Sequence, residues 1–261
     1  EIPQSIRKLA DPRICDDQEA ERIIESVPPI AWINFANDGG ETAAFEAGIQ
    51  LAYQLASGTD EFTRKVLDNM VVIINTAANP DSHQRFTDWM KAVAIGPEGN
   101  ADPFAMEHNV PWYLSSDGNH YLIDSNRDAF ALTQVETQAV ARALHHWNPQ
   151  VWVDNHGEPD EYYFAPFCAP MNRNYPDELR KWATELGKLC AVNFDRMGWS
   201  YAKDDTYDLF YPGYWDSYPA LNGAVSATFE TNGGGWKQPS WERPDGPIPT
   251  LRLAVHGPFM A

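Results

Sequence analysis

Four ionisable side chains of this sequence have the types and positions that metal-assisted chemistry requires. Asp38 and Glu41 follow one short apolar run, His156 follows a second run, and Glu230 ends a third. Such runs, bounded by Gly and polar residues, are typical of buried strands, and open α/β sheets place ligands at the carboxyl ends of their strands. A mononuclear hydrolytic metal site needs about three protein ligands, one open position and a carboxylate that moves a proton. The four residues meet that requirement.

Each of the four residues also has an ordinary structural interpretation. An aspartate such as Asp38 is common in turns, and Glu41 is placed to begin a helix. His156 fits a hydrogen-bonded loop histidine equally well, and Glu230 fits a partner of a basic side chain. The residue types alone therefore leave open both a metal site and four unrelated structural roles.

Strands and helices alternate along the sequence. Apolar content and spacing predict strands at 29–36, 71–75, 151–157 and 223–230, and helices at 43–55, 133–147 and 176–197. This alternation predicts a three-layer α/β/α fold with a mixed, mostly parallel central sheet. Spacings of three and four residues predict the apolar side of each outer helix. In the first it consists of Phe45, Ile49, Ala52, Tyr53 and Ala56, and in the last of Leu179, Trp182, Leu186, Leu189, Cys190 and Val192.

Three connecting segments have local signals of their own. Thr133 to Glu136 resembles a capping box that would start the middle helix. Residues 79–82 have the composition of a turn. Residues 91–122 are rich in Gly, Pro, Asn and Asp, and so long an irregular stretch usually indicates function or irregular packing.

Composition limits the class of protein. A chain of 261 residues with 43% hydrophobic content can bury the core of one domain, which we expect to span residues 1–261. The formal charge of −18 disfavours binding to nucleic acid or to anionic membranes. No apolar run approaches the ~20 residues of a membrane span. Three cysteines without C-x-x-C spacing give no support to a zinc knuckle or redox pair, but they leave one disulfide possible.

Three short segments in a fixed order carry a family resemblance. Asn-Pro-Asp at 79–81, Asn-Arg-Asp at 126–128 and Asp-x-His at 154–156 resemble the zinc carboxypeptidases of the carboxypeptidase A type, especially bacterial members. The resemblance covers about residues 9–260 and implies a carboxypeptidase A-like fold.

The resemblance also implies a set of metal ligands. In the family, a His-x-x-Glu pair and a later His hold Zn²⁺, and the matching positions here are Asp38, Glu41 and His156. The first histidine of the family pattern is therefore an aspartate in this chain. That exchange leaves Zn²⁺ as the expected cofactor and makes another divalent metal possible.

Substrate and proton-transfer roles follow from the same resemblance. Asn126 and Arg127 match the family's pair that binds the terminal carboxylate of the substrate, and Glu230 matches its general base. Arg85 is the expected oxyanion-stabilising arginine, with Lys91 as the alternative. The family's mobile tyrosine, which lies over the substrate, is expected at Tyr211, with Tyr207 and Tyr214 as alternatives.

The implied activity is hydrolysis of C-terminal residues from peptides that have a free C-terminus, by metal-activated water. Two alternatives stay open. One is a degenerate domain with weak or no metal that acts as a binding or scaffold protein, for which Asp38 is the main argument. The other is a related amidase or deacylase. The resemblance to this family also implies an exported bacterial hydrolase, which would be secreted or periplasmic.

Overall fold

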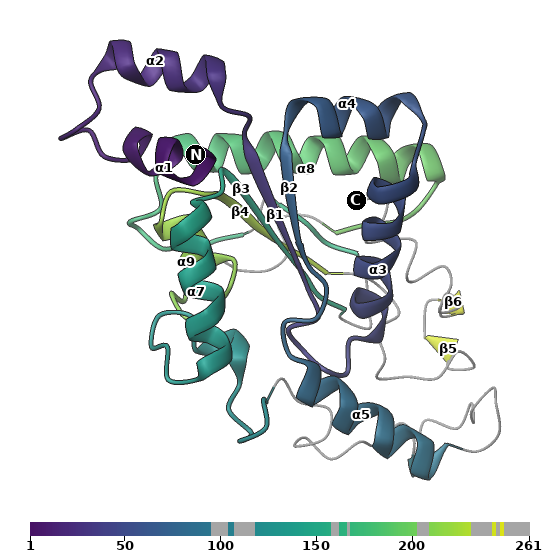
Figure 1. Cartoon of the computed structure of the whole chain (residues 1–261). Helices are drawn as coiled ribbons and strands as arrows, with labels where there is room; N and C mark the ends of the chain where they lie inside the picture. The colour runs from purple at the N-terminus through teal and green to yellow at the C-terminus, as the bar shows by residue number, and fades with distance from the viewer. Residues whose placement is uncertain are drawn as a thin grey trace.

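A computed structural model of the chain describes residues 1–94, 104–106, 118–157, 162–165, 168–202 and 209–230, and in addition 242–243 and 246–247. Its helices are α1 (Ile2–Leu9), α2 (Asp17–Ser26), α3 (Thr42–Ser57), α4 (Glu61–Asn69), α5 (Pro80–Val93), the 3-10 helix η2 (Ser125–Arg127), α7 (Val135–Trp147), α8 (Asp177–Met197) and α9 (Ser217–Leu221) (Figure 1). Its strands are β1 (Ile30–Phe35), β2 (Val71–Asn75), β3 (Val151–Asn155), β4 (Val225–Phe229), β5 (Glu242–Arg243) and β6 (Gly246–Pro247).

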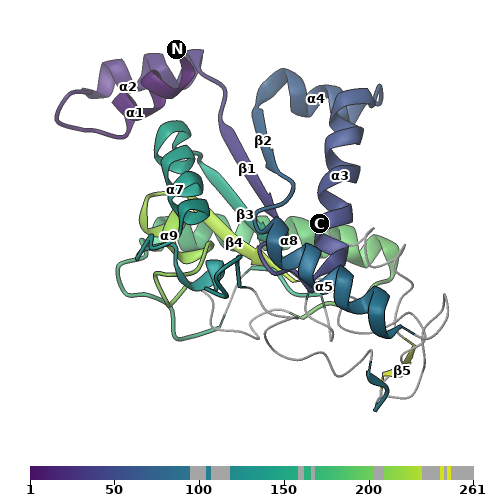
Figure 2. The same cartoon turned by 60° about the horizontal axis from the view of Figure 1, so that its bottom comes forward.

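Within the described residues, the main sheet consists of four parallel strands in the order β2-β1-β3-β4. Each of these strands lies inside one of the predicted apolar runs, so the predicted α/β class is confirmed. β5 and β6 form a separate antiparallel pair. Because the four strands are parallel, the segments that follow them all leave from the same edge of the sheet (Figure 2).

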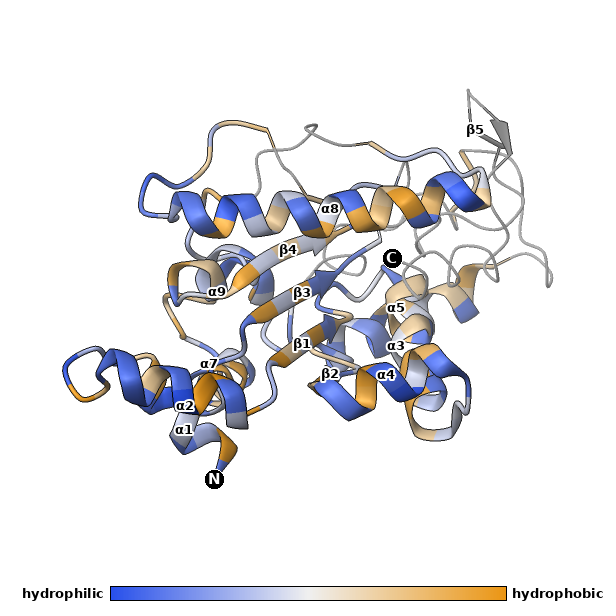
Figure 3. Ribbon diagram, turned by 90° about the horizontal axis from the view of Figure 1, so that it is seen from above, coloured by the Kyte–Doolittle hydropathy of each residue, from blue (hydrophilic) through white to orange (hydrophobic). Residues whose placement is uncertain are grey.

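Helices cover both faces of the sheet. On one face, Val153 and Ala227 pack against α8, and Phe35 packs against α3. On the other face, Trp32 and Trp152 stack with ring centroids 4.9 Å apart and pack against α7. Figure 3 shows α8 and α7 on opposite sides of the strands, and α1 packs on α7. The predicted three layers are therefore present.

The predicted apolar side of α3 is wrong in part. Ile49 and Tyr53 are 60% and 72% exposed. Phe45 is buried as predicted, and the other buried residues of the helix are small. A Cβ added at Gly48 would lie 3.0 Å from the ring of Phe35, so the helix approaches the sheet closely. Small residues permit that approach, which large ones at the same positions would prevent.

The predicted apolar side of α8 is also right only in part. Cys190 is buried and Leu179 and Leu186 pack against the core, as predicted. Trp182, Leu189 and Val192 are exposed, whereas Ala183 and Phe194, which were not predicted, are buried. Periodicity identified the helix and its bounds, but it did not identify which of two neighbouring stripes faces the sheet. Burial raises the pKa of the Cys190 thiol to about 12, as expected for a thiol that packs as an apolar group.

Residues 79–82 begin a helix and do not form the predicted turn. The Asn79 side chain accepts a hydrogen bond from the backbone N–H of Ser82, and Pro80 occupies the first turn of α5. Asparagine at the N-cap and proline next to it are both favoured at helix starts. The helix then continues to Val93, into the segment predicted to be irregular.

The predicted capping box at Thr133 is also wrong. α7 begins at Val135, and its N-cap Gln134 makes no side-chain cap hydrogen bond. The carboxylate of Asp128 instead accepts hydrogen bonds from Thr133 N–H and Oγ1, Gln134 N–H and Thr137 Oγ1. Asp128 therefore fixes the two residues that precede α7 and the Thr137 side chain in its first turn, without accepting from a backbone N–H of the helix itself.

Two absences apply to the described part of the chain. No helix within it is long and apolar enough to cross a membrane. Cys15, Cys168 and Cys190 are all free thiols, so the disulfide left open by the sequence is not formed.

Candidate metal centre

Asp38, Glu41 and His156 converge at the carboxyl edge of the sheet. All three side chains are buried, and one ligand atom from each lies within 4.8 Å of the others. Nδ1 of His156 is 2.9 Å from Glu41 Oε2 and 3.1 Å from Asp38 Oδ2. The cause is topological, because β1 and β3 are neighbours and the two segments that carry these residues leave them side by side.

The turn after β1 is held by its contact with the start of α5. The backbone N–H of Asn79 donates to the carbonyl of Ala36, which has a positive φ of 66°. A Cβ at Gly39 would lie 2.2 Å from Ser82 Oγ and 2.3 Å from the Ser82 carbonyl carbon, so only glycine fits there. Glu41 follows as the N-cap of α3. A strand end and a helix start thus present the two carboxylates.

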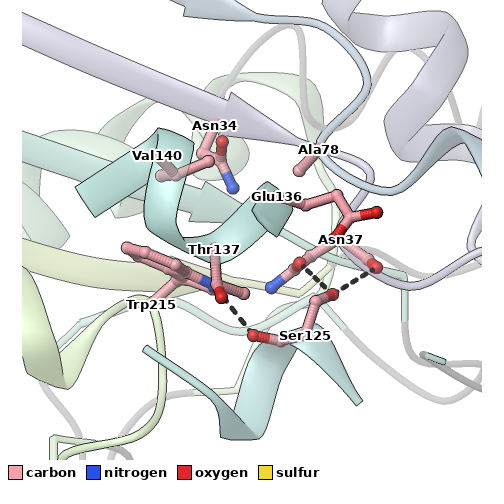
Figure 4. Close-up of a pocket in the computed structure, with 8 residues that line it drawn as sticks. All are labelled: Asn34, Asn37, Ala78, Ser125, Glu136, Thr137, Val140 and Trp215. Carbon is pink, nitrogen blue, oxygen red and sulfur yellow. Dashed lines mark hydrogen bonds between the residues drawn. The ribbon is translucent and has the colours of Figure 1, made fainter. Parts of the chain in front are cut away.

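Asn37 ties this turn to η2, as Figure 4 shows. Ser125 Oγ donates to Asn37 Oδ1 at 2.8 Å, and Trp215 Nε1 donates to the carbonyl of Ser125 at 3.0 Å. These residues and the first turns of α7 enclose a cavity of about 10 Å³. That volume holds about one water molecule, so the cavity is a packing feature and not a substrate pocket.

His156 has a third carboxylate on the opposite side of its ring. Asp154 Oδ2 lies 2.9 Å from Nε2, and both side chains are buried. Asp154 was predicted only as part of the Asp-x-His segment, and its contact with His156 was not predicted. A charged residue within a predicted buried strand could have indicated the contact, because a buried carboxylate needs a hydrogen-bond or charge partner.

Three carboxylates set the charge state of His156. Burial alone would lower its pKa, but the charges of Glu41, Asp154 and Asp38 outweigh burial and raise the pKa well above the usual range. Carboxylates crowded around one imidazole therefore favour a positive charge at this point of the structure.

The residues present fit a divalent cation. Asp38 Oδ1 is buried and has no hydrogen-bond partner among the residues that the structure describes. Buried polar atoms are normally paired, so this oxygen indicates a missing positive partner. One nitrogen and two carboxylates make a ligand set that suits Zn²⁺ or a harder divalent ion.

A fourth acidic side chain, Asp124, faces this centre from the start of η2. Its pKa is raised to about 6, first by burial and then by the charge of Asp38. Asp124 also accepts a hydrogen bond from the backbone N–H of Asn126 at 2.8 Å. Asp124 was not predicted to be a functional residue. The sequence shows that it lies two residues before Asn126, but not that it lies close to Asp38.

Asn126 and Arg127 lie beside the centre. Asn126 Nδ2 is 3.4 Å from His156 Nε2, and Asn126 Oδ1 accepts from the backbone N–H of Trp215. The guanidinium of Arg127 lies 4.7 Å from the ring centroid of Tyr214, and its side chain is 46% exposed. The pair therefore extends from the three converging side chains toward solvent.

Glu230 follows β4 as His156 follows β3. The two strands are neighbours, and the backbone N–H of His156 donates to the carbonyl of Phe229 at 2.8 Å. Glu230 is 8% exposed and accepts a hydrogen bond from the Tyr163 hydroxyl at 3.1 Å. Its carboxylate thus comes from the strand end adjacent to the proposed ligand His156.

The other predicted residues occupy varied positions. Arg85 in α5 donates to the carbonyls of Gly118 and Asn119 at 3.2 and 2.6 Å, so it braces that segment. Lys91 is exposed and lies 3.5 Å from Asp88. The remaining candidates are the tyrosines: Tyr211 donates to the carbonyl of Arg127 at 3.2 Å, Tyr214 lies under the Arg127 guanidinium, and Tyr207 lies outside the described residues.

Solved structures with the same fold are metallocarboxypeptidases. The chain resembles a metallo-carboxypeptidase from Burkholderia cenocepacia with a TM-score of 0.61 and 16% identity, over 90% of this chain and 55% of the other. The metallo-carboxypeptidase from Pseudomonas aeruginosa in complex with (2-guanidinoethylmercapto)succinic acid has a TM-score of 0.60 and 13% identity, over 90% of this chain and 55% of the other. Carboxypeptidase A from Helicoverpa armigera has a TM-score of 0.58 and 16% identity, over 89% of this chain and 58% of the other. The chain thus spans little more than half of the length of these proteins.

No curated protein matches the chain in sequence, whereas one family model does. The model of the family described as zinc carboxypeptidase (Peptidase_M14) matches residues 22–224, which include β1, β2, β3 and the three converging side chains. On that match the chain belongs to the zinc carboxypeptidase family.

Proposed function

We propose that this protein is a metal-dependent carboxypeptidase that removes C-terminal residues from peptides. The observation that carries the proposal is the convergence of Asp38, Glu41 and His156 at the sheet edge where Glu230 also ends its strand. Ligands and a proton acceptor are thereby supplied by the same region of the fold.

Asp38, Glu41 and His156 would hold the cation. When bound, a divalent metal activates water for attack and polarises the carbonyl of the scissile peptide bond. The ligand set also affects the affinity. Two histidines and a glutamate leave a Zn²⁺ centre at +1, whereas the ligands here leave it neutral and richer in oxygen. We therefore expect weak zinc binding and an activity optimum on the alkaline side.

Glu230 would accept the proton of the attacking water. Its carboxylate is nearly buried and oriented by the Tyr163 hydroxyl, as a general base must be. Arg85 would stabilise the oxyanion if its guanidinium exchanged its present carbonyl partners for substrate.

Asn126 and Arg127 would bind the terminal carboxylate of the peptide. A guanidinium binds a carboxylate through two parallel hydrogen bonds, and the Tyr214 ring supports it from one side. Tyr211, whose hydroxyl contacts the Arg127 backbone, would lie over the substrate. The ligand of the Pseudomonas relative is a succinic acid derivative, which is consistent with a site that binds carboxylates.

The experiment is metal analysis of the purified protein together with hydrolysis of a panel of peptides with free and blocked C-termini. Release of single residues from free peptides only, dependent on metal, is the expected result. Cleavage of blocked peptides or of small acyl amides would instead indicate the amidase or deacylase alternative. The family also suggests that the protein acts in a secreted or periplasmic setting.

A degenerate binding domain is the second candidate, and Asp38 favours it. An aspartate there places two acidic groups, Asp38 and Asp124, close to each other. Absence of both metal and hydrolysis would establish this alternative. The argument against a degenerate domain is that Glu41, His156 and Glu230 still lie in one region with Asp38.

A further inference from the structure

A line of hydrogen bonds crosses three strands and ends at His156. Asn75 Nδ2 donates to Asn34 Oδ1 at 2.8 Å, and Asn34 Nδ2 donates to Asp154 Oδ1 at 2.7 Å. The second oxygen of Asp154 lies 2.9 Å from His156 Nε2. Strand register pairs Asn34 with both Asn75 and Asp154, so the three residues form one row across β2, β1 and β3, here called the polar row.

We propose that Asn34 and Asn75 are positioning residues that act through Asp154 to hold the His156 ring with Nδ1 toward the metal centre. The inference rests on the proposed function, because it assumes that the three converging side chains hold a divalent cation. It adds two residues on neighbouring strands that contact neither the cation nor the substrate.

The direction of the hydrogen bonds follows from donor and acceptor chemistry. A carboxylate only accepts, so Asn34 must turn its NH₂ group toward Asp154 and its carbonyl oxygen away. That oxygen then requires a donor, which the NH₂ group of Asn75 supplies. On the other side of Asp154, His156 must carry a proton on Nε2, which leaves the Nδ1 lone pair for a metal. Each link thus determines the orientation of the next.

A competing contact at Nε2 is weaker. Asn126 Nδ2 lies 3.4 Å away, and a hydrogen bond from it would require a lone pair on Nε2. That lone pair would then face the Asp154 carboxylate at 2.9 Å. Two buried acceptors without a proton between them would leave a buried polar group unsatisfied, which is unfavourable. The shorter contact with Asp154 therefore determines the tautomer.

Burial makes the polar row sensitive to substitution. Asn34 and Asp154 are each 1% exposed, so water has little access to replace a lost partner. Thr228 is the register neighbour of Asp154 on the other side, but its hydroxyl donates to Asp216 at 3.1 Å. Thr228 therefore provides a matched control, since it is buried beside Asp154 without donating to it in the structure.

The first test measures Zn²⁺ affinity by competition with a chromophoric chelator. We expect Asn34→Leu to weaken binding by about 10–100-fold, the range typical of lost outer-shell partners of metal ligands. Asn75→Leu, on the half-buried edge strand, should cause a smaller loss, and Thr228→Val should bind as the parent does. Parental affinity in folded Asn34→Leu, or equal losses in all three variants, would overturn the proposal.

The second test needs no metal. In ¹H–¹⁵N NMR spectra of the metal-free protein, the buried proton on His156 Nε2 should give a slowly exchanging downfield resonance. It should shift or exchange faster in Asn34→Leu and Asn75→Leu but not in Thr228→Val. An unchanged resonance in both asparagine variants would overturn the polar row. A parent protein that binds neither zinc nor another divalent metal would overturn the proposed function, and the NMR comparison would still decide the role of the polar row.

Discussion

The two sides of the candidate metal centre differ in how completely their polar atoms are paired. On the β3 side, His156 has hydrogen-bond partners at both ring nitrogens, and Asp154 is itself held by Asn34. On the β1 side, Asp38 Oδ1 has no partner within the described ranges. Burial and the charge of Asp38 also raise the pKa of Asp124.

This difference separates orientation from charge balance. Neutral amides and a carboxylate can orient a histidine before any metal arrives. Two facing carboxylates cannot be balanced in this way, because only a cation or a proton compensates their charge. The β3 side matches the family pattern, and the β1 side departs from it at Asp38. The following predictions test each side.

The largest effect is expected at Glu230. Glu230→Gln removes the proton acceptor while keeping size and hydrogen-bonding capacity, so turnover should fall by about 10²–10⁴-fold. Metal content should stay at the parental level, because the substituted group is not a ligand. Turnover and bound metal measured on the same preparation check this. Retained activity would exclude Glu230 from the reaction.

Substrate binding should depend on Arg127. Amidating the C-terminus of a peptide removes the carboxylate, and loss of a charge-assisted hydrogen-bonded pair costs about 1.5–3 kcal/mol, or roughly 10–100-fold in kcat/KM. Arg127→Ala should weaken hydrolysis of free peptides by a similar factor and largely remove the difference between free and amidated substrates. Equal hydrolysis of both substrates by the parent would contradict the carboxypeptidase assignment.

Replacing Asp38 by the histidine of the family pattern should give the β1 side the same type of proposed ligand as the β3 side. Asp38→His restores a nitrogen ligand with similar reach, and we expect zinc to bind about tenfold more tightly, or ~1.4 kcal/mol, with higher activity near neutral pH. Zinc titrations and pH–rate profiles of both proteins measure this. Asp38→Ala serves as the control and should lose metal. If it binds metal as the parent does, Asp38 is not a ligand.

The metal-free protein should lose stability as pH rises. The pKa of His156 is raised above 6.5 on folding, so its stabilising contribution is complete below pH 6.5 and is lost as pH rises through the folded value. The pKa of Asp124 is raised from 3.8 to about 6, which also favours the protonated folded state, and this contribution is lost as pH rises from 3.8 to about 6.

Zinc replaces those protons, so the stabilisation by zinc should increase with pH. Thermal unfolding with zinc or with a chelator, between pH 5 and pH 8, checks this on the scale of about 2–4 °C per kcal/mol. Asp38→His, with one carboxylate fewer near Asp124, should show a weaker pH dependence without metal. A zinc-induced shift in Tm that is independent of pH would contradict this account.

The strands were predictable because their signal is local. Each is a short apolar run, and the turn from Asn37 to Glu41 begins directly after one of them. The edge at which they end follows from parallel topology, so the meeting of Asp38, Glu41 and His156 was also predictable. Long-range pairings were not. Nothing near Asp38 in sequence shows that Asp124 faces it.

Helix orientation failed for a different physical reason. Large apolar residues such as Tyr53 and Trp182 dominate a periodic pattern, although the sheet accepts small residues at its closest approach. The polar row escaped detection because an asparagine in a strand does not reveal its partner. Only register places Asn34 between Asn75 and Asp154.

The fit of Gly39 against Ser82 restricts how this centre can evolve. The backbone of α5 blocks every side chain at position 39, so no compensating change at position 82 alone would release it. At position 38 the aspartate and histidine codons differ by a single nucleotide. If Asp38 is a metal ligand as proposed, a single mutation could therefore change which metal the protein prefers, while the close approach at Gly39 keeps the path of the loop.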